Sequence, residues 1–272
     1  MNRRLEVVAA GRGGWFTRPD ALAAGYSDSQ IRQRVRTGQW IRMGFNSYVD
    51  PRGWQADEPP WDRAVRLHRL TVRMARERLG DVVVSHQSAA MLHGLPVWGA
   101  DLTKAHFTRL GSGQSRVGRS IQVHRGAIAA DEVVELEGLE LTRCERAIVE
   151  TACTTSYEVG VVLADAALRM RLTTRDRLAA VVRRHRHWRG LPAAYTAVQF
   201  ADGLSESVGE SRLRVLMANH GLPKPEPQVV IRINWPDLDV PHDTAARLWR
   251  AMSVYAKGTG DKQLPIASPR RG

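Results

Sequence analysis

The 272-residue sequence has few cysteines, few lysines and no long apolar run, and each shortage excludes a class of protein. Its two cysteines, Cys144 and Cys153, are too few for a disulfide framework or for a zinc site of their own. No stretch approaches the roughly 18 consecutive apolar residues of a membrane span. The start of the chain is basic, but Glu6 and Arg12 interrupt the apolar core that a signal peptide needs. We therefore expect a cytoplasmic protein with no membrane partner.

Acidic residues are also in short supply relative to basic ones. The 40 Lys and Arg residues against 28 Asp and Glu give a formal charge of +12 and a pI near 10.7. Such an excess favours polyanionic partners, nucleic acid first. However, only four of the basic residues are lysines, and an arginine-rich composition with abundant Ala, Val and Gly is also what a GC-rich genome encodes. The positions of the arginines must therefore decide whether the charge has a function.

The hydrophobicity pattern predicts a mixed α/β fold that is rich in helix. After a Pro- and Gly-containing linker over residues 51–60, a long helix is expected at about 61–79. Residues 61–200 then read as a mixed α/β middle domain, and no internal repeat is visible. Its expected strands are 82–84, 105–109, 120–125 and 139–141, and its expected later helices are 143–153, 157–170, 174–184 and 192–200.

The first 50 residues have the layout of a winged helix-turn-helix. A short helix at 5–10 ends in glycines, and Thr17 and Ser27 are good N-caps for two further helices. The second of these ends at Gly38, and two short strands, 40–43 and 46–50, follow around a turn at Gly44. In such folds the second helix of the motif lies in the major groove of DNA.

Residues 27–36 are the candidate recognition helix. Ile31 and Val35 are expected to face the core, which leaves polar side chains that can read base edges, while the flanking arginines suit phosphates. The alternative is a small solvated helix with scattered arginines. The candidate DNA-binding residues are Arg18, Ser27, Ser29, Gln30, Arg32, Gln33, Arg34, Arg36, Arg42 and Tyr48.

Two histidine-containing segments invite a catalytic or metal-binding interpretation. Ser85-His86 lacks the surroundings of a nucleophilic serine and no triad can be identified, so Ser85 is interpreted as a helix cap. His185 and His187 are two residues apart and would point to different sides of a helix, which makes them poor joint metal ligands. The run of arginines around them is interpreted as a solvated helix end, with a supplementary phosphate-contacting patch as the alternative.

A helix expected at 205–220, followed by a strand at 228–233, raises the question of a metal-dependent nuclease. Such a site needs acidic residues, and usually a lysine, on neighbouring strands. Asp237, Asp239 and Asp243 follow in a context that does not predict strands. Glu206 and Glu210 are therefore interpreted as exposed carboxylates near the start of a helix.

These segments together resemble a known family. Residues 14–50, with Phe16-Thr17-Arg18-Pro19-Asp20 and Ile31-Arg32-Gln33-Arg34-Val35-Arg36, resemble the winged-helix domain of AbiEi-type antitoxins from type IV toxin–antitoxin systems. Segments 84–96 and 163–169 resemble actinobacterial members. Residues 202–228, with Glu210 and Gly221-Leu222-Pro223, resemble the opening of the domain similar to very-short-patch-repair endonucleases, of the PD-(D/E)XK fold, that often ends these proteins.

The resemblance implies a DNA-binding regulator that represses its own toxin–antitoxin operon and needs no cofactor. Expected partners are double-stranded DNA, a nucleotidyltransferase-type toxin and a second protomer, contacted through the middle domain. The family's Glu-Tyr-Asp-Gly strand is missing after residue 233, so we interpret 201–233 as a remnant, 234–272 as an atypical tail, disordered from 256, and the C-terminus as truncated or frameshifted. The alternatives are a Mg²⁺-dependent endonuclease in which Glu210 is catalytic, and an interaction protein without DNA binding.

Overall fold

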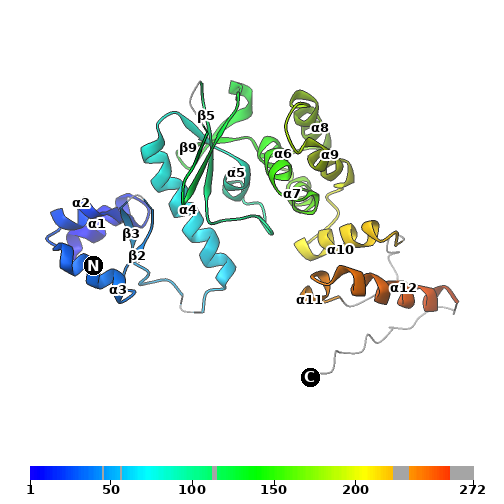
Figure 1. Cartoon of the computed structure of the whole chain (residues 1–272), viewed down its shortest axis with the longest axis horizontal. Helices are drawn as coiled ribbons and strands as arrows, with labels where there is room; N and C mark the ends of the chain where they lie inside the picture. Colours follow the sequence, from blue (N-terminus) through cyan, green and yellow to red (C-terminus); the bar gives the residue numbers. More distant parts are fainter. Residues whose placement is uncertain (45, 56, 112–114, 223–232, 258–272) are drawn as a thin grey trace.

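The computed structural model describes residues 1–44, 46–55, 57–111, 115–222 and 233–257. The expected mixed α/β fold, rich in helix, is confirmed. Its strands contain fewer residues than most of its helices. Within these ranges, no helix combines the length and the apolar character that crossing a membrane requires. Figure 1 shows the N-terminal elements at one end, a sheet flanked by helices in the centre, and the last three helices at the other end.

The N-terminal elements surround a small antiparallel sheet. They run α1 (Arg3–Gly11), β1 (Trp15–Thr17), α2 (Arg18–Ala23), α3 (Asp28–Arg36), β2 (Ile41–Arg42) and β3 (Ser47–Val49), and the strand order is β1-β3-β2. The three expected helices and two expected strands are present. Strand β1 was not predicted, because three residues between two glycines and a helix cap are too few to show an alternating pattern.

Both faces of this sheet are buried. Phe16 and Tyr48 point toward the helices and pack with Trp40, whose ring centroid lies 4.7 Å from that of Phe16. Their strand neighbours Trp15 and Val49 point the opposite way, as the two-residue period of a strand requires. They pack against Leu70 and Met74 of the long helix α4 (Pro60–Leu79). The N-terminal elements therefore rest on the middle of the molecule through an apolar contact.

A mixed six-stranded sheet forms the centre of the described structure. Its strands are β4 (Val82–Val84), β5 (Ala105–Arg109), β6 (Arg116–Val117), β7 (Ile121–Arg125), β8 (Val133–Leu136) and β9 (Leu139–Thr142), in the order β6-β7-β5-β4-β9-β8. Strand β5 runs parallel to β7 and antiparallel to β4. The four expected strands are present. The edge strands β6 and β8 were not expected, because they are only two and four residues long and neither shows an alternation of apolar and polar residues.

Helices cover this sheet and continue the core beyond it. Helix α5 (His86–Leu92) packs against β5, and a short 3-10 turn (Ala130–Glu132) precedes β8. Figure 1 shows the next four helices on the side of the sheet away from the N-terminus. They are α6 (Cys144–Thr154), α7 (Tyr157–Arg169), α8 (Arg175–Arg184) and α9 (Leu191–Phe200), all within one or two residues of expectation.

The last described helices form a small cluster of their own. They are α10 (Val208–Asn219), α11 (Trp235–Leu238) and α12 (Pro241–Lys257), joined by Leu216, Leu238 and Leu248. The strand expected at 228–233 lies outside the described residues except for its last position. Helix α12 continues to Lys257, and the rest of the tail expected to be disordered lies outside the described residues.

Candidate functional site

Helix α3 is held at its start by a complete capping box. The Ser27 backbone N–H donates to Gln30 Oε1 at 2.8 Å, and the Gln30 backbone N–H donates to Ser27 Oγ at 3.3 Å. The Ser29 hydroxyl is hydrogen-bonded to Ser27 Oγ at 2.8 Å. Ile31 is buried, and Val35 packs against the same apolar cluster. The cap and the buried side of the helix fix which residues face solvent.

One exposed face of α3 carries four polar side chains in register. Ser29, Arg32, Gln33 and Arg36 are all exposed, and their spacing of i, i+3, i+4 and i+7 places them on one side of the helix. Ile31 and Val35 lie on the opposite side. We call this set the α3 polar face. Its arginine and glutamine side chains are of the kinds that read guanine and adenine in the major groove.

Two of the arginines predicted to contact DNA are engaged within the protein. Arg18 donates to both carboxylate oxygens of Asp28, at 2.8 and 2.6 Å. The hydrogen bonds from Arg18 lower the pKa of the exposed Asp28 carboxyl and raise that of the guanidinium. Arg34 lies over the rings of Tyr26 and Trp40, 5.1 and 5.3 Å from their centroids, and donates to Gln39. Arg34 therefore braces the helix, and it is not part of the α3 polar face.

The position of Tyr48 does not favour the DNA contact predicted for it. Its ring is only 6% exposed and stacks against Phe16, because it points from β3 into the apolar cluster that the N-terminal helices cover. Arg42, by contrast, is exposed on β2, as its predicted role requires.

The turn after β2 lies beside an arginine-lined cleft that the sequence did not reveal. A cleft of about 550 Å³ is bordered by Arg42, by Arg78 at the end of α4, and by Arg119 before β7. The backbone of Gly44 passes so close to Ser120 that a β-carbon there would lie 2.6 Å from Ser120 Oγ. Three arginines from separate segments thus converge near the N-terminal sheet, and their sequence distance explains why no local pattern showed it.

The cap assigned to Ser85 needs correction. Ser85 occupies the N-cap position of α5, but its hydroxyl makes no capping hydrogen bond. Ser85 Oγ is instead 2.9 Å from His86 Nδ1 and accepts from Thr108 Oγ1 at 2.9 Å. The Ser85-His86 pair is fully buried beside Glu150, whose carboxylate accepts from the His86 backbone N–H.

The helix end around His185 is only partly the solvated surface that the sequence predicted. His187 and the neighbouring Arg183 and Arg186 are exposed. His185, however, is buried, and its Nε2 lies 2.6 Å from Glu132 Oε1. Its ring stacks on Trp188. His185 is therefore a structural contact between α8 and the segment before β8.

Glu210 lies in the first turn of α10, as expected. It is exposed, and its carboxylate accepts from the Glu206 backbone N–H and from Ser207 Oγ. Asp237 and Asp239 lie in or beside α11 and pair with Arg247 and Arg212. Neither aspartate is on a strand, so the described residues do not arrange these carboxylates as the strand-borne ligands of a nuclease site.

Comparisons with known proteins relate the N-terminal elements to a family of regulators. Residues 3–44 match the family model described as "Transcriptional regulator, AbiEi antitoxin". Over 232 residues, the chain is 29% identical to an uncharacterized protein of Mycobacterium tuberculosis strain H37Rv, Rv2248, and to its counterpart MT2308 in strain CDC 1551. The match covers 82% of this chain and 79% of each relative. The family match, which includes the whole of α3, supports a transcriptional regulator of the AbiEi antitoxin type.

Proposed function

We propose that this protein binds double-stranded DNA as a transcriptional regulator of the AbiEi antitoxin type. The observation that carries the proposal is the α3 polar face: Ser29, Arg32, Gln33 and Arg36 share one exposed side of a capped helix. The order helix, strand, helix, helix, strand, strand is that of a winged helix-turn-helix, in which α3 would be the recognition helix. The family match covers the same segment.

In this proposal α3 enters the major groove with its polar face toward the bases. Arg32 and Arg36 donate to guanine, and Gln33 makes paired hydrogen bonds to adenine. Arg42, Arg78 and Arg119 border a cleft beside the N-terminal sheet and contact phosphates, which position the protein without specifying sequence. Arg18 and Arg34 act indirectly, because they hold α3 in place.

The regulated gene set is proposed from the family match alone. An antitoxin of this type represses its own operon, and its partner is a nucleotidyltransferase-type toxin. The buried contact between the N-terminal sheet and α4 leaves α3 exposed, so the middle of the molecule can bind a toxin or a second protomer while α3 is on DNA. A cytoplasmic location follows from this role.

A salt titration of binding to the DNA upstream of the gene tests the proposal. The logarithm of the binding constant should fall linearly with that of the salt concentration, with a slope of about −0.9 per phosphate neutralised. Fluorescence anisotropy with labelled duplex, against a scrambled duplex of equal composition, measures both affinity and preference. Absence of binding at low salt would overturn the proposal.

Two triple variants with the same loss of charge separate a specific interface from general basicity. In the first, Arg32, Arg36 and Arg42 are replaced by Ala; in the second, the exposed Arg175, Arg183 and Arg186 on and beside α8 are replaced. We expect the first variant to lose preference for the upstream duplex and about one unit of salt slope, because Arg42 is its phosphate-contacting residue. The second should keep the preference. Equal losses would place the interface elsewhere.

A further inference from the structure

Among the described residues, three histidines from three separate elements form a compact group. His86 begins α5, His106 lies on β5 and His124 lies on β7. One ring nitrogen of each lies within 4.8 Å of the others. The rings of His86 and His124 stack with centroids 3.7 Å apart, and the His106 ring lies 5.1 Å from that of His124. Histidine is the most common protein ligand for transition metals.

The sheet register brings these rings together. Strands β5 and β7 are parallel neighbours, and His124 pairs with Thr108, two residues beyond His106. The alternation of a strand therefore puts His106 and His124 on the same face, opposite to the core residues Phe107 and Val123. His86 joins them from the end of β4 with a left-handed backbone, φ +54°. Such a backbone is uncommon for a residue with a side chain and costs free energy.

Burial keeps the three rings neutral. It lowers the pKa of His106 to about 3 and that of His124 to about 4, and it lowers the pKa of His86 well below its usual value. Because metals bind the neutral imidazole, metal binding near neutral pH need not release a proton from these rings. Each ring then offers one lone pair.

Polar side chains lie beside the second ring nitrogens of His86 and His106. His86 Nδ1 faces Ser85 Oγ, which leaves Nε2 for a metal. His106 Nδ1 and His124 Nε2 face each other at 2.9 Å, close to the roughly 3.3 Å that tetrahedral zinc requires between two nitrogens. His106 Nε2 contacts the Gln87 amide, whose Oε1 is buried without a hydrogen-bond partner among the described residues. Rotation of that amide supplies an acceptor for His106 Nε2–H when Nδ1 binds metal.

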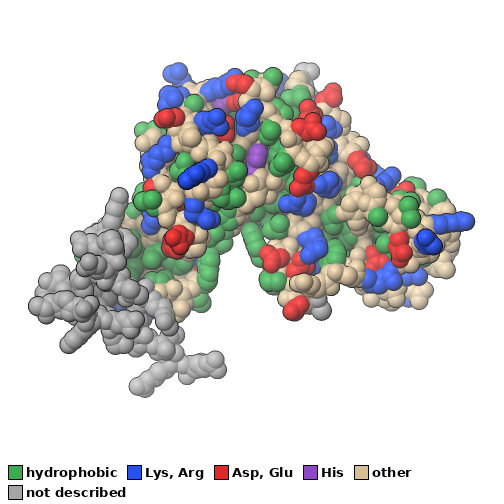
Figure 2. All heavy atoms as spheres, turned by 180° about the vertical axis from the view of Figure 1, so that it is seen from behind, with side chains coloured by type: hydrophobic (Ala, Val, Ile, Leu, Met, Phe, Trp, Pro, Cys, Tyr) green, Lys and Arg blue, Asp and Glu red, His purple; other side chains and the backbone are tan. Residues whose placement is uncertain are grey.

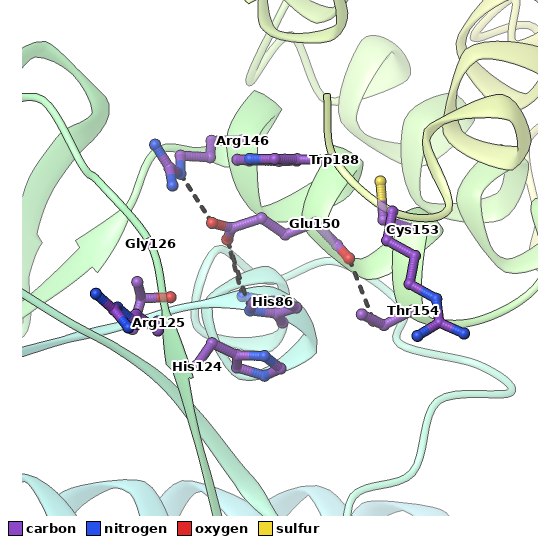
Figure 3. Close-up of a pocket in the computed structure, with 11 residues that line it drawn as sticks. His86, His124, Arg125, Gly126, Arg146, Glu150, Cys153, Thr154 and Trp188 are labelled. Atoms are coloured by element: carbon purple, nitrogen blue, oxygen red, sulfur yellow. Dashed lines mark hydrogen bonds and ion pairs between the residues drawn. The ribbon is translucent and has the colours of Figure 1, made fainter. Parts of the chain in front are cut away.

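A pocket gives access to this group. His86 and His124 line a cavity of about 260 Å³ together with Arg125, Thr154 and Trp188. Figure 3 shows the His86 ring beneath the Glu150 carboxylate, which is held by Arg146, and the His124 ring below that of His86. A fourth coordination position can therefore be filled from solvent.

We propose that His86 Nε2, His106 Nδ1 and His124 Nε2 bind one divalent transition metal, with Zn²⁺ as the first candidate. Its fourth ligand is water or a small anion from the pocket. The metal ties the start of α5 to β5 and β7, so it stabilises the sheet and holds His86 in its left-handed backbone. This site is independent of α3 and of DNA binding.

The first test uses the tag-free full-length protein and two metals. After dialysis with Zn²⁺, we expect about one zinc per chain by mass spectrometry, as for one tetrahedral site, and a higher melting temperature. Substitution with Co²⁺ should give the intense visible absorption of a tetrahedral nitrogen site. No retained metal, or a weak octahedral cobalt spectrum, would overturn the proposal.

The second test identifies the ligands. His124→Gln should lower zinc affinity at least about 100-fold and abolish the rise in melting temperature, whereas His187→Gln, which removes an exposed imidazole, should leave both unchanged. Chemical footprinting of histidines in the unaltered protein gives the same information without any substitution. Zinc should protect His86, His106 and His124 together. Unaltered binding by His124→Gln, or protection of other histidines only, would refute the assignment.

Discussion

The arginines of α3 and those of the middle of the molecule differ in their surroundings. Arg32 and Arg36 are exposed to solvent, whereas Arg146 is only 2% exposed. Arg146 donates to Glu150 Oε1 at 2.8 Å, to Glu132 and to the Ala127 carbonyl, and it lies over the Trp188 ring. The arginines that make up the formal charge of +12 are therefore not equivalent. Part of it is compensated inside the protein, and part is free to attract a polyanion.

Arginines near the end of the described chain are also paired within the protein, unlike those of α3. Arg212 donates to Glu158, Asp239 and the Leu238 carbonyl, and Arg214 donates to Asp165 and the Phe200 carbonyl. These pairs join α10 to α7 and α11. Figure 2 shows basic and acidic side chains interspersed over one face of the molecule. A count of arginines thus overstates the charge available for DNA, and the comparison can be tested by removing arginines of each kind.

The largest expected effect comes from the interior arginine. Arg146→Ala leaves Glu150 buried without its arginine partner and removes one partner of Glu132, and breaking a buried pair in this way costs about 3–5 kcal/mol. Urea unfolding followed by circular dichroism measures the loss. Arg183→Ala, at an exposed position in the same region, should change the free energy of unfolding by less than about 0.5 kcal/mol. Similar values for the two variants would remove the distinction between interior and surface arginines.

The second prediction concerns the loss of stability in acid. It compares residues 1–50, which contain no histidine, with the middle of the chain, which contains several. Burial lowers the pKa of His68, which contacts the Leu102 carbonyl and Ser88 Oγ. The unfolded chain then binds a proton below about pH 6.5 that the folded chain does not, so the free energy of unfolding falls as the pH falls. This one group contributes a slope of up to about 1.4 kcal/mol per pH unit.

Urea midpoints between pH 7 and 5 measure this slope in metal-free protein. His68→Gln should reduce it, and His187→Gln should leave it unchanged because that ring is exposed. A profile of His68→Gln that runs parallel to that of the unaltered protein would show that burial of His68 does not cause the acid sensitivity.

A smaller effect is expected at the helix cap. Ser27→Ala removes the hydroxyl that accepts from the Gln30 backbone N–H and should cost about 1 kcal/mol. The matched control is Ser29→Ala, since that exposed hydroxyl, within the described part of the chain, is hydrogen-bonded to Ser27 Oγ alone. Thermal unfolding measures both. A larger loss in the control would show that the local cap does not set the stability of α3.

The smallest effect on stability is expected where the effect on binding should be greatest. Arg32→Ala and Arg36→Ala should each change the free energy of unfolding by less than about 0.5 kcal/mol. Each should nevertheless weaken discrimination between the upstream and scrambled duplexes, by about 1–3 kcal/mol for a bidentate guanine contact. Loss of stability in step with loss of binding would show that these residues support the fold instead of contacting DNA.

Much of the fold could be predicted from the sequence because its signals are local. Thr17 and Ser27 predict the starts of two helices, and the structure has a complete capping box at each. The spacing of Ile31 and Val35 predicts the buried side of α3. The α3 polar face follows from that spacing. Strands β1, β6 and β8 were missed because each is two to four residues long or exposed at an edge, where the hydrophobic period is too short to read.

The sequence by itself determined the helices, their caps and which side of α3 meets solvent, because each depends on residues within about one or two turns of each other. Only the tertiary structure decided what lies on the far side of each element. Helix α4 buries Trp15 and Val49 by covering one face of the N-terminal sheet, and the glutamates Glu132 and Glu150 neutralise Arg146. The register of β5 and β7 gathers histidines that lie 18 or more residues apart. Burial and charge pairing are set by such distant contacts, and a periodic pattern carries no record of them.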